Sequence, residues 1–129
     1  DTITLKRNKQ NRTIKQILGH LTDSASNNHQ RMVRLQYSKD LLFFPDYRQD
    51  NDLWIALQDY QNEDWNNLIQ LWKFFNLHII QVIKSVDQTK LDSYWCDFEG
   101  TKVTLQDMIE GYLSHLHLHI HEIHELMNA

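Results

Sequence analysis

The sequence is poor in residues that interrupt helices and in residues that cross-link chains. Among its 129 residues there are three glycines, one proline and one cysteine. So few helix breakers leave long stretches of the chain free to form helices. The single cysteine, Cys96, excludes an intrachain disulfide and fits a reducing compartment, so we expect a location in the cytoplasm.

Two further absences narrow the class of partner. No apolar run approaches the roughly 20 residues that cross a bilayer, so we expect no membrane span. The 13 Lys and Arg residues are scattered among 17 Asp and Glu residues, for a formal net charge of −4. This distribution lacks the basic patch of a nucleic-acid-binding protein, so we expect no nucleic acid partner. The length indicates a single domain over residues 1–129.

Apolar residues recur every three to four positions in three long segments, which predicts three long amphipathic helices and one short one. The expected helices span about residues 14–37, 51–60, 63–86 and 105–127. Two starts carry capping signals, because Thr13 precedes Gln16 and Thr104 precedes Asp107 at the capping-box spacing. We expect the intervening segments 38–50 and 87–103 to be loops.

Three wide apolar stripes need a fourth partner to close an antiparallel, up-and-down bundle. The sequence therefore predicts an all-α four-helix bundle, whose missing partner could be an N-terminal helix that precedes residue 1. Dimerisation could cover the same surface instead, and we expect a homodimer.

Five of the eight histidines lie in the stretch LSHLHLHIHEIHEL, residues 113–126. Strict alternation would place all five on one face of a strand, but the longer flanking pattern has the helical period. On a helix, His115 and His119 lie at the edge of the apolar face, whereas His117, His121 and His124 point to the opposite side.

Two histidines four residues apart on one helix face form a chelating pair, although two ligands alone bind weakly. His20 offers a third ligand, because it lies at the edge of the apolar stripe of the first long helix and begins a polar seam with Ser24 and Asn27. Three neutral imidazoles with open coordination positions suit Zn²⁺, Ni²⁺ or Fe²⁺. Taken alone, a half-buried histidine such as His20 more often has a structural, hydrogen-bonded role.

For most of the remaining histidines, tryptophans and the cysteine, the sequence indicates structural or surface roles. The three outward histidines are expected on the solvated surface, and His29 and His78 in structural or surface positions. Trp54 and Trp95 lie outside the long apolar stripes and are the better candidates for a pocket wall. Cys96 has no basic neighbour in sequence that would activate it.

Glu122 is the acid best placed to support the histidines. It lies one turn past His119 and about 20° from His115 around the helix, whereas Asp23 projects about 60° away from His20. Glu122 is therefore a candidate general base or hydrogen-bond partner of a metal-binding histidine, although a surface acid is the more frequent role for such a residue.

The segment TIKQILGHLTDS, followed far downstream by a terminal helix with H-x-x-x-H, resembles the DinB/YfiT superfamily of small bacterial four-helix bundles. The shared pattern I-x-x-I-x-x-H-L-x-D-S falls on Ile14, Ile17, His20, Leu21, Asp23 and Ser24. His115 and His119 correspond to the paired histidines of the final helix, and FPDYRQDNDLWIALQDYQ is similar to the loop and short helix of YfiT-like members. The likeness spans most of the chain. The resemblance implies that the first helix of the bundle lies before residue 1, and the sequence departs from the family there. It also departs at Arg12, where an aromatic residue is common.

The resemblance implies one divalent metal ion held by His20, His115 and His119, with water completing the coordination shell. Such a site could lower the pKa of bound water to hydrolyse a small substrate, or hold a low-molecular-weight thiol for transfer to an electrophile. A non-catalytic bundle that binds metal or a protein partner is the third interpretation.

Overall fold

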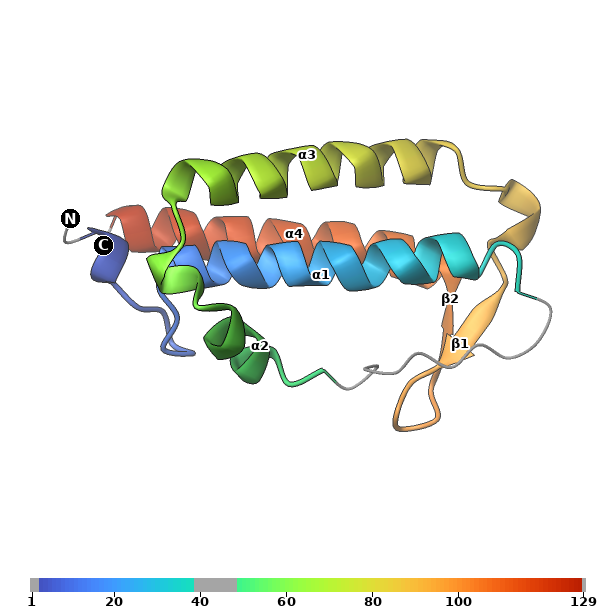
Figure 1. Cartoon of the computed structure of the whole chain (residues 1–129). Coiled ribbons are helices and arrows are strands. Elements are labelled where there is room, and N and C mark those ends of the chain that lie inside the picture. Colours follow the sequence, from blue (N-terminus) through green and yellow to red (C-terminus); the bar gives the residue numbers. More distant parts are fainter. Residues whose placement is uncertain (1–2, 39–48, 129) are drawn as a thin grey trace.

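The computed structural model describes residues 3–38 and 49–128, and three long helices and a short one dominate this part of the chain (Figure 1). The helices are α1 (Ile14–Arg34), α2 (Asn51–Gln58), α3 (Trp65–Lys84) and α4 (Leu105–Asn128). The smaller elements are η1 (Ile3–Leu5), η2 (Tyr60–Asn62), η3 (Gln88–Lys90), β1 (Tyr94–Cys96) and β2 (Lys102–Thr104). The predicted helices are confirmed, and most of the predicted loop 38–50 lies outside the described residues.

The capping residues form the hydrogen bonds that their spacing predicts. The Thr13 hydroxyl accepts the backbone N–H of Gln16 at 3.3 Å, and the Gln16 side chain accepts the backbone N–H of Thr13 at 3.0 Å. Thr104 and Asp107 make the same reciprocal pair at the start of α4. These contacts satisfy N–H groups that lack partners within the helix, and so define where α1 and α4 begin.

The segment 87–103, predicted as a loop, contains a short β-hairpin instead. Its strands β1 and β2 pair antiparallel, with Trp95 opposite Val103. The Asp97 carboxylate accepts two backbone N–H groups of the turn, and Gly100 takes a φ of +83° that favours glycine. The aromatic and β-branched residues on either side of this Asp and Gly are the signal that the sequence prediction overlooked.

The three long helices do not simply alternate in direction, because α1 and α3 run the same way and α4 runs opposite to both (Figure 1). Lys15 Nζ donates to the backbone carbonyl of Glu63 over 2.6 Å, which places the start of α3 beside the start of α1. At the other end, the Asp87 N–H donates to the Gln36 side chain over 3.0 Å. The chain thus returns to the beginning of α1, where α2 and η2 pack, before it enters α3.

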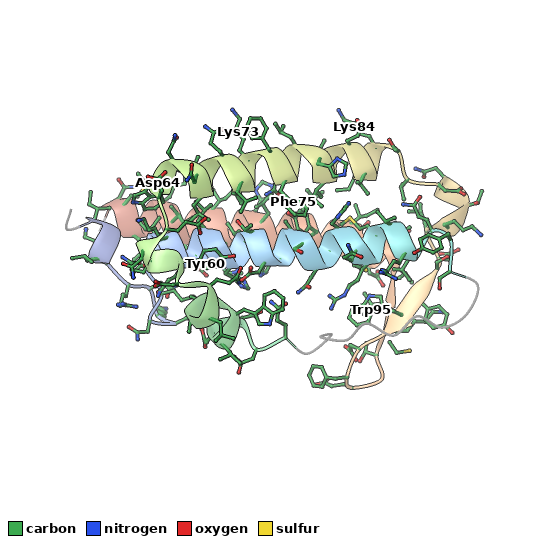
Figure 2. The ribbon with its side chains drawn as sticks, in the orientation of Figure 1. Tyr60, Asp64, Lys73, Phe75, Lys84 and Trp95 are labelled. Atoms are coloured by element: carbon green, nitrogen blue, oxygen red, sulfur yellow. The ribbon has the colours of Figure 1, made fainter. Side chains whose placement is uncertain are left out.

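Two clusters of buried apolar side chains lie at opposite ends of the bundle. The cluster at the hairpin end comprises Ala25, Met32, Leu35, Ile79, Trp95, Leu105, Met108 and Tyr112. The cluster at the other end comprises Leu18, Leu21, Ile55, Tyr60 and Leu68. Figure 2 shows Trp95 and Tyr60 marking the two ends. Each large side chain buried in this way contributes roughly 1.5–3 kcal/mol to stability.

Apolar surface also remains uncovered on the bundle. Five large apolar side chains of α3 are exposed, namely Ile69, Leu71, Phe74, Leu77 and Ile80. The expectation of a homodimer depends on faces of this kind and stays a prediction. None of the helices in residues 3–38 and 49–128 combines the length and apolar character needed to cross a membrane.

Two helical glycines should respond in opposite ways to alanine. A Cβ at Gly19 would lie 2.2 Å from the ring of Tyr60, whereas a Cβ at Gly111 would meet nothing within 4 Å. We expect Gly19→Ala to destabilise the fold by roughly 1–3 kcal/mol through this clash. Gly111→Ala should stabilise it by up to about 1 kcal/mol through helix propensity. Urea unfolding of both variants measures the difference, and stabilisation by both would contradict the close packing of Tyr60 on α1.

Candidate metal centre

His20 of α1 and His115 and His119 of α4 converge on one another. The ring centroid of His20 lies 4.9 Å from that of His119 and 5.3 Å from that of His115, and the two α4 rings are 4.3 Å apart. One ring nitrogen of each histidine lies within 4.8 Å of the other two. The i, i+4 spacing places the α4 pair on one face, and the packing of α1 against α4 adds the third ring. These three residues could hold a metal ion.

Burial favours the neutral, metal-binding form of His20 and His115. His20 and His119 are each 5% exposed, and His115 is half-buried. Burial, the charge of Arg12 and the neighbouring imidazoles lower the pKa of His20 to about 3. Burial and the adjacent His119 also lower the pKa of His115. Both imidazoles are therefore neutral at neutral pH. A metal ion can bind them without first removing a proton from an imidazolium ring.

Glu122 orients one of the three rings. Its Oε2 lies 3.2 Å from Nδ1 of His119 and accepts a 3.1 Å hydrogen bond from the Asn8 amide. The carboxylate favours a proton on this Nδ1, which leaves the Nε2 lone pair of His119 directed at His115, whose own Nε2 is 2.9 Å away. Glu122 is thus a half-buried partner of the cluster rather than a free surface acid.

The donor set fits a divalent cation. The buried Nδ1 of His20 has no hydrogen-bond partner among the described residues. A buried nitrogen without a partner is unfavourable, and two imidazole nitrogens that face each other share at most one proton. Zn²⁺, Ni²⁺ and Fe²⁺ all accept such neutral imidazole ligands.

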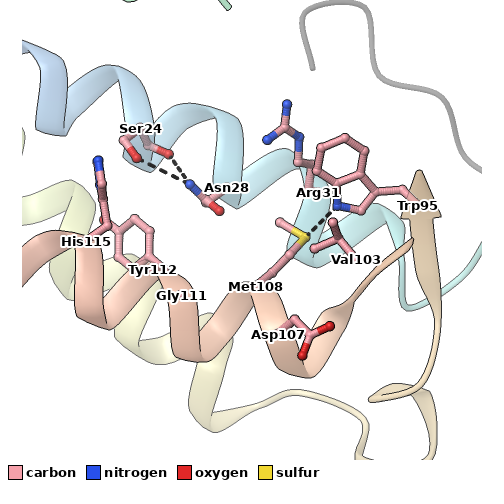
Figure 3. Close-up of a pocket in the computed structure, with 10 residues that line it drawn as sticks. All are labelled: Ser24, Asn28, Arg31, Trp95, Val103, Asp107, Met108, Gly111, Tyr112 and His115. Atoms are coloured by element: carbon pink, nitrogen blue, oxygen red, sulfur yellow. Dashed lines mark hydrogen bonds between the residues drawn. The ribbon is translucent and has the colours of Figure 1, made fainter. Parts of the chain in front are cut away.

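A cavity of about 330 Å³ opens beside His115, between α1, α4 and the hairpin (Figure 3). Its lining combines apolar and polar side chains from all three elements. The lining residues are Ser24, Asn28, Arg31, Trp95, Val103, Asp107, Met108, Gly111, Tyr112 and His115. The cluster is therefore closed on the side of His20 and His119 and accessible through His115.

Comparison with known proteins identifies the family. A model of the DinB superfamily matches residues 2–123. The chain belongs to the DinB superfamily. Its fold is similar to that of YfiT from Bacillus subtilis, with a TM-score of 0.86 and 20% sequence identity over 99% of this chain and 73% of YfiT. YfiT is described as a probable metal-dependent hydrolase with an unusual four-helix bundle topology. No curated protein matches the sequence significantly.

The remaining histidines of this DinB chain lie apart from the cluster. His117, His121 and His124 are exposed, and His121 lies 3.1 Å from the exposed Glu125 carboxylate. His29 and His78 face each other across α1 and α3, with ring centroids 5.2 Å apart. The helical interpretation of the histidine-rich stretch therefore separates the two inward rings from the three outward ones correctly.

Of the two tryptophans predicted as candidates for a pocket wall, Trp95 lines the cavity and Trp54 does not. Trp95 is buried and forms part of the cavity wall, where its Nε1 donates to the sulfur of Met108 over 3.1 Å. Trp54 is half-buried on α2 and does not line this cavity. Cys96 is half-buried on β1 and also lies outside the lining.

Arg12 departs from the family pattern in the sequence, and in the structure its charge acts on the histidine cluster. Its guanidinium is buried and donates to the Asp52 carboxylate at 3.0 and 3.2 Å. The charge of Arg12 lowers the pKa of His20 and so helps to keep that ring neutral. No local sequence pattern marks this pair, because its partners come from separate elements that only the fold brings together.

Asp23 has a structural place near the cluster. It is 4% exposed and accepts hydrogen bonds from the Tyr60 hydroxyl at 2.7 Å and the Gln58 amide at 2.9 Å. Its second carboxylate oxygen has no partner among the described residues. Asp23 therefore fastens α2 and η2 to α1, in agreement with its predicted direction away from His20.

Asp23→Asn should flatten the pH dependence of stability. Burial raises the pKa of Asp23 in the folded state above its value of about 4 in the unfolded chain. Its stabilising contribution is therefore full below pH 4 and is lost as the pH rises through the folded-state pKa. Relative to wild type, Asp23→Asn should gain stability between pH 4 and pH 7 in urea unfolding. An unchanged difference between the two proteins at both pH values would contradict a raised pKa.

Proposed function

We propose that this DinB-superfamily protein is a metal-dependent hydrolase of a small substrate, in which His20, His115 and His119 hold one divalent ion. The observation that carries the proposal is the convergence of two buried imidazoles and one half-buried imidazole beside a cavity, with the pKa of His20 and of His115 lowered. The similarity in fold to YfiT, itself described as a probable metal-dependent hydrolase, supports the same class of activity.

A bound divalent ion would acidify a water molecule and polarise the bond to be cleaved. The protein contributes position and environment. Glu122, held by Asn8, keeps the His119 ring in one orientation, and Arg12 disfavours protonation of His20. His115 forms the boundary between the cluster and the cavity, so a substrate in the cavity would have its reacting bond beside this ring.

The cavity also offers groups that can orient a substrate. Ser24 and Asn28 lie one and two turns beyond His20 on α1, and both line the cavity. The Asn28 amide nitrogen donates to the Ser24 backbone carbonyl at 2.8 Å, which fixes the plane of the amide and leaves its oxygen as an acceptor (Figure 3). This arrangement gives the substrate a polar wall next to the cluster.

Metal content tests the proposal directly. Untagged wild-type protein should carry about one divalent ion per chain by elemental analysis. His20→Ala and His115→Ala should each lose most of it, because two imidazoles alone bind weakly. The matched control replaces His117, His121 and His124 together, since these lie on the same helix but face solvent, and this variant should keep its metal.

Circular dichroism distinguishes loss of a ligand from loss of the fold in these variants. Metal retained by both single variants and lost by the triple variant would place the ion on the surface and contradict the proposal. Turnover is then measured on panels of esters and amides, and on thiols paired with electrophiles, before and after chelation and metal restoration. Hydrolysis that disappears with the metal and returns with it supports a hydrolase, whereas activity confined to the thiol panel would contradict one.

Glu122→Gln should weaken metal binding without disturbing the helix. Removal of the carboxylate charge makes the His119 ring a poorer ligand, and changes of this kind cost roughly 10–100-fold in metal affinity. Glu125→Gln is the matched control. Among the described residues, the histidine that Glu125 contacts is the exposed His121. Competition with a chromogenic chelator measures both affinities, and equal affinities would contradict the role of Glu122.

A further inference from the structure

A second pair of histidines lies on the bundle, apart from the three-histidine cluster. His29 of α1 and His78 of α3 have ring centroids 5.2 Å apart, with an angle of 70° between the ring planes. His29 follows His20 by nine residues on the same helix, which places it about 14 Å further along the axis and on the opposite face. The pair therefore belongs to the contact between α1 and α3, whereas the cluster belongs to the contact between α1 and α4.

Two side chains of α3 position the ring of His29. Phe75, which lies between α3 and α1 in Figure 2, has its ring centroid 5.6 Å from that of His29, at an angle of 83° between the planes. Phe75 and His78 are three residues apart and therefore share one face of α3. His29 is half-buried and His78 is exposed, so the pair lies at the edge of the helix contact and is open to solvent.

The ring nitrogens of this pair are not used by other protein groups. Within the part of the chain that the structure describes, no hydrogen bond or ion pair involves His29 or His78. The residues one turn before and one turn after each histidine on its own helix are uncharged. Burial and the neighbouring His78 lower the pKa of His29, so this ring is neutral at neutral pH. Neutral imidazoles without a competing partner are available as metal ligands.

The separation of the two rings suits one shared ion. At Zn–N distances of about 2.0–2.1 Å, two imidazoles on a tetrahedral ion have their ring centres roughly 5 Å apart. The ring centroids within the three-histidine cluster are 4.3, 4.9 and 5.3 Å apart, and the value for His29 and His78 lies in the same range. Rotation about χ2, a soft torsion in histidine, turns a nitrogen of each ring toward the space between them.

We propose that His29 and His78 form a second metal site, which binds a divalent transition ion such as Zn²⁺ between α1 and α3, with water as the remaining ligands. Imidazole is a preferred ligand of Zn²⁺, Ni²⁺ and Cu²⁺ but not of Mg²⁺. Two protein ligands bind weakly, so dialysis removes this ion while an ion in the three-histidine cluster stays. The site exists only where α1 and α3 are packed together, so the bound ion stabilises the folded chain.

Calorimetry tests the site in a variant in which His117, His121 and His124 are all replaced by Gln. This triple variant is needed because His117 and His121, four residues apart on α4, are themselves a chelating pair. The protein is loaded with Zn²⁺, dialysed and titrated with Zn²⁺ again. One ion per chain should bind beyond any that survives dialysis, and Mg²⁺ should give no such event. His29→Gln or His78→Gln in this background should weaken the event by about tenfold or more, because one imidazole remains.

Urea unfolding measures whether the ion joins the two helices. Zn²⁺ at 100 times the dissociation constant of the weak event should lower the unfolding equilibrium constant about 100-fold more in the triple variant than after a further His29→Gln or His78→Gln change. Gln81→Ala is the matched control, since it removes an exposed amide one turn from His78 that bonds to Ser85, and it should keep the full effect. The readout is the change that Zn²⁺ causes within one protein, so a variant with altered stability in the absence of Zn²⁺ still tests the site.

Absence of the weak binding event would overturn the inference, as would an event that persists unchanged after His29→Gln or His78→Gln. Equal stabilisation of the triple variant and its two derivatives by Zn²⁺ would overturn it as well. These outcomes are separate from those of the proposed function. An empty three-histidine cluster with an intact response at His29 and His78 would contradict the hydrolase alone. Loss of that response in a protein whose His20, His115 and His119 keep their metal would contradict this inference alone.

Discussion

The packing of α1 against α4 across the three imidazoles of His20, His115 and His119 is the constraint on which the rest of the structure depends. Two cores of apolar side chains hold the helices at either end, and the polar cluster lies where α1 and α4 face each other between them. Buried polar groups are unfavourable unless they are paired or bind a ligand. A rotation of either helix would separate the rings, so the apolar clusters that fix the helix faces also fix the geometry of the site.

The surroundings of the cluster differ on its two sides. On one side the segment before α1 contributes Asn8 and Arg12, which reach Glu122 and Asp52 respectively. Asn8 acts on the cluster through Glu122, which orients His119, and the charge of Arg12 helps to keep His20 neutral. On the other side the half-buried His115 borders the cavity. A centre closed on one side and accessible on the other suits chemistry on a bound small molecule.

The fold and the chemistry rest on different observations. At 20% identity, the similarity to YfiT establishes the architecture, including a chain that returns to the start of α1 before α3 begins. One fold supports many functions, so the chemistry has to be argued from the side chains in the site. The hairpin is important here, because Trp95 and Val103 close the cavity wall and Trp95 supports the guanidinium of Arg31.

The sequence by itself determined the helices, two of their caps and the separation of the histidines, since these depend on contacts between residues close in the chain. Periodicity alone placed His115 and His119 on the inner face of their helix and His117 on the outer one. Only the tertiary structure decided which groups meet across elements: Glu122 with Asn8, Arg12 with Asp52, and Arg31 with Trp95. The hairpin was not predicted because strands of three residues carry little periodic signal, and only their aromatic and β-branched residues indicate them. The cavity exists only where two helices and that hairpin come together, and no local pattern encodes such a space.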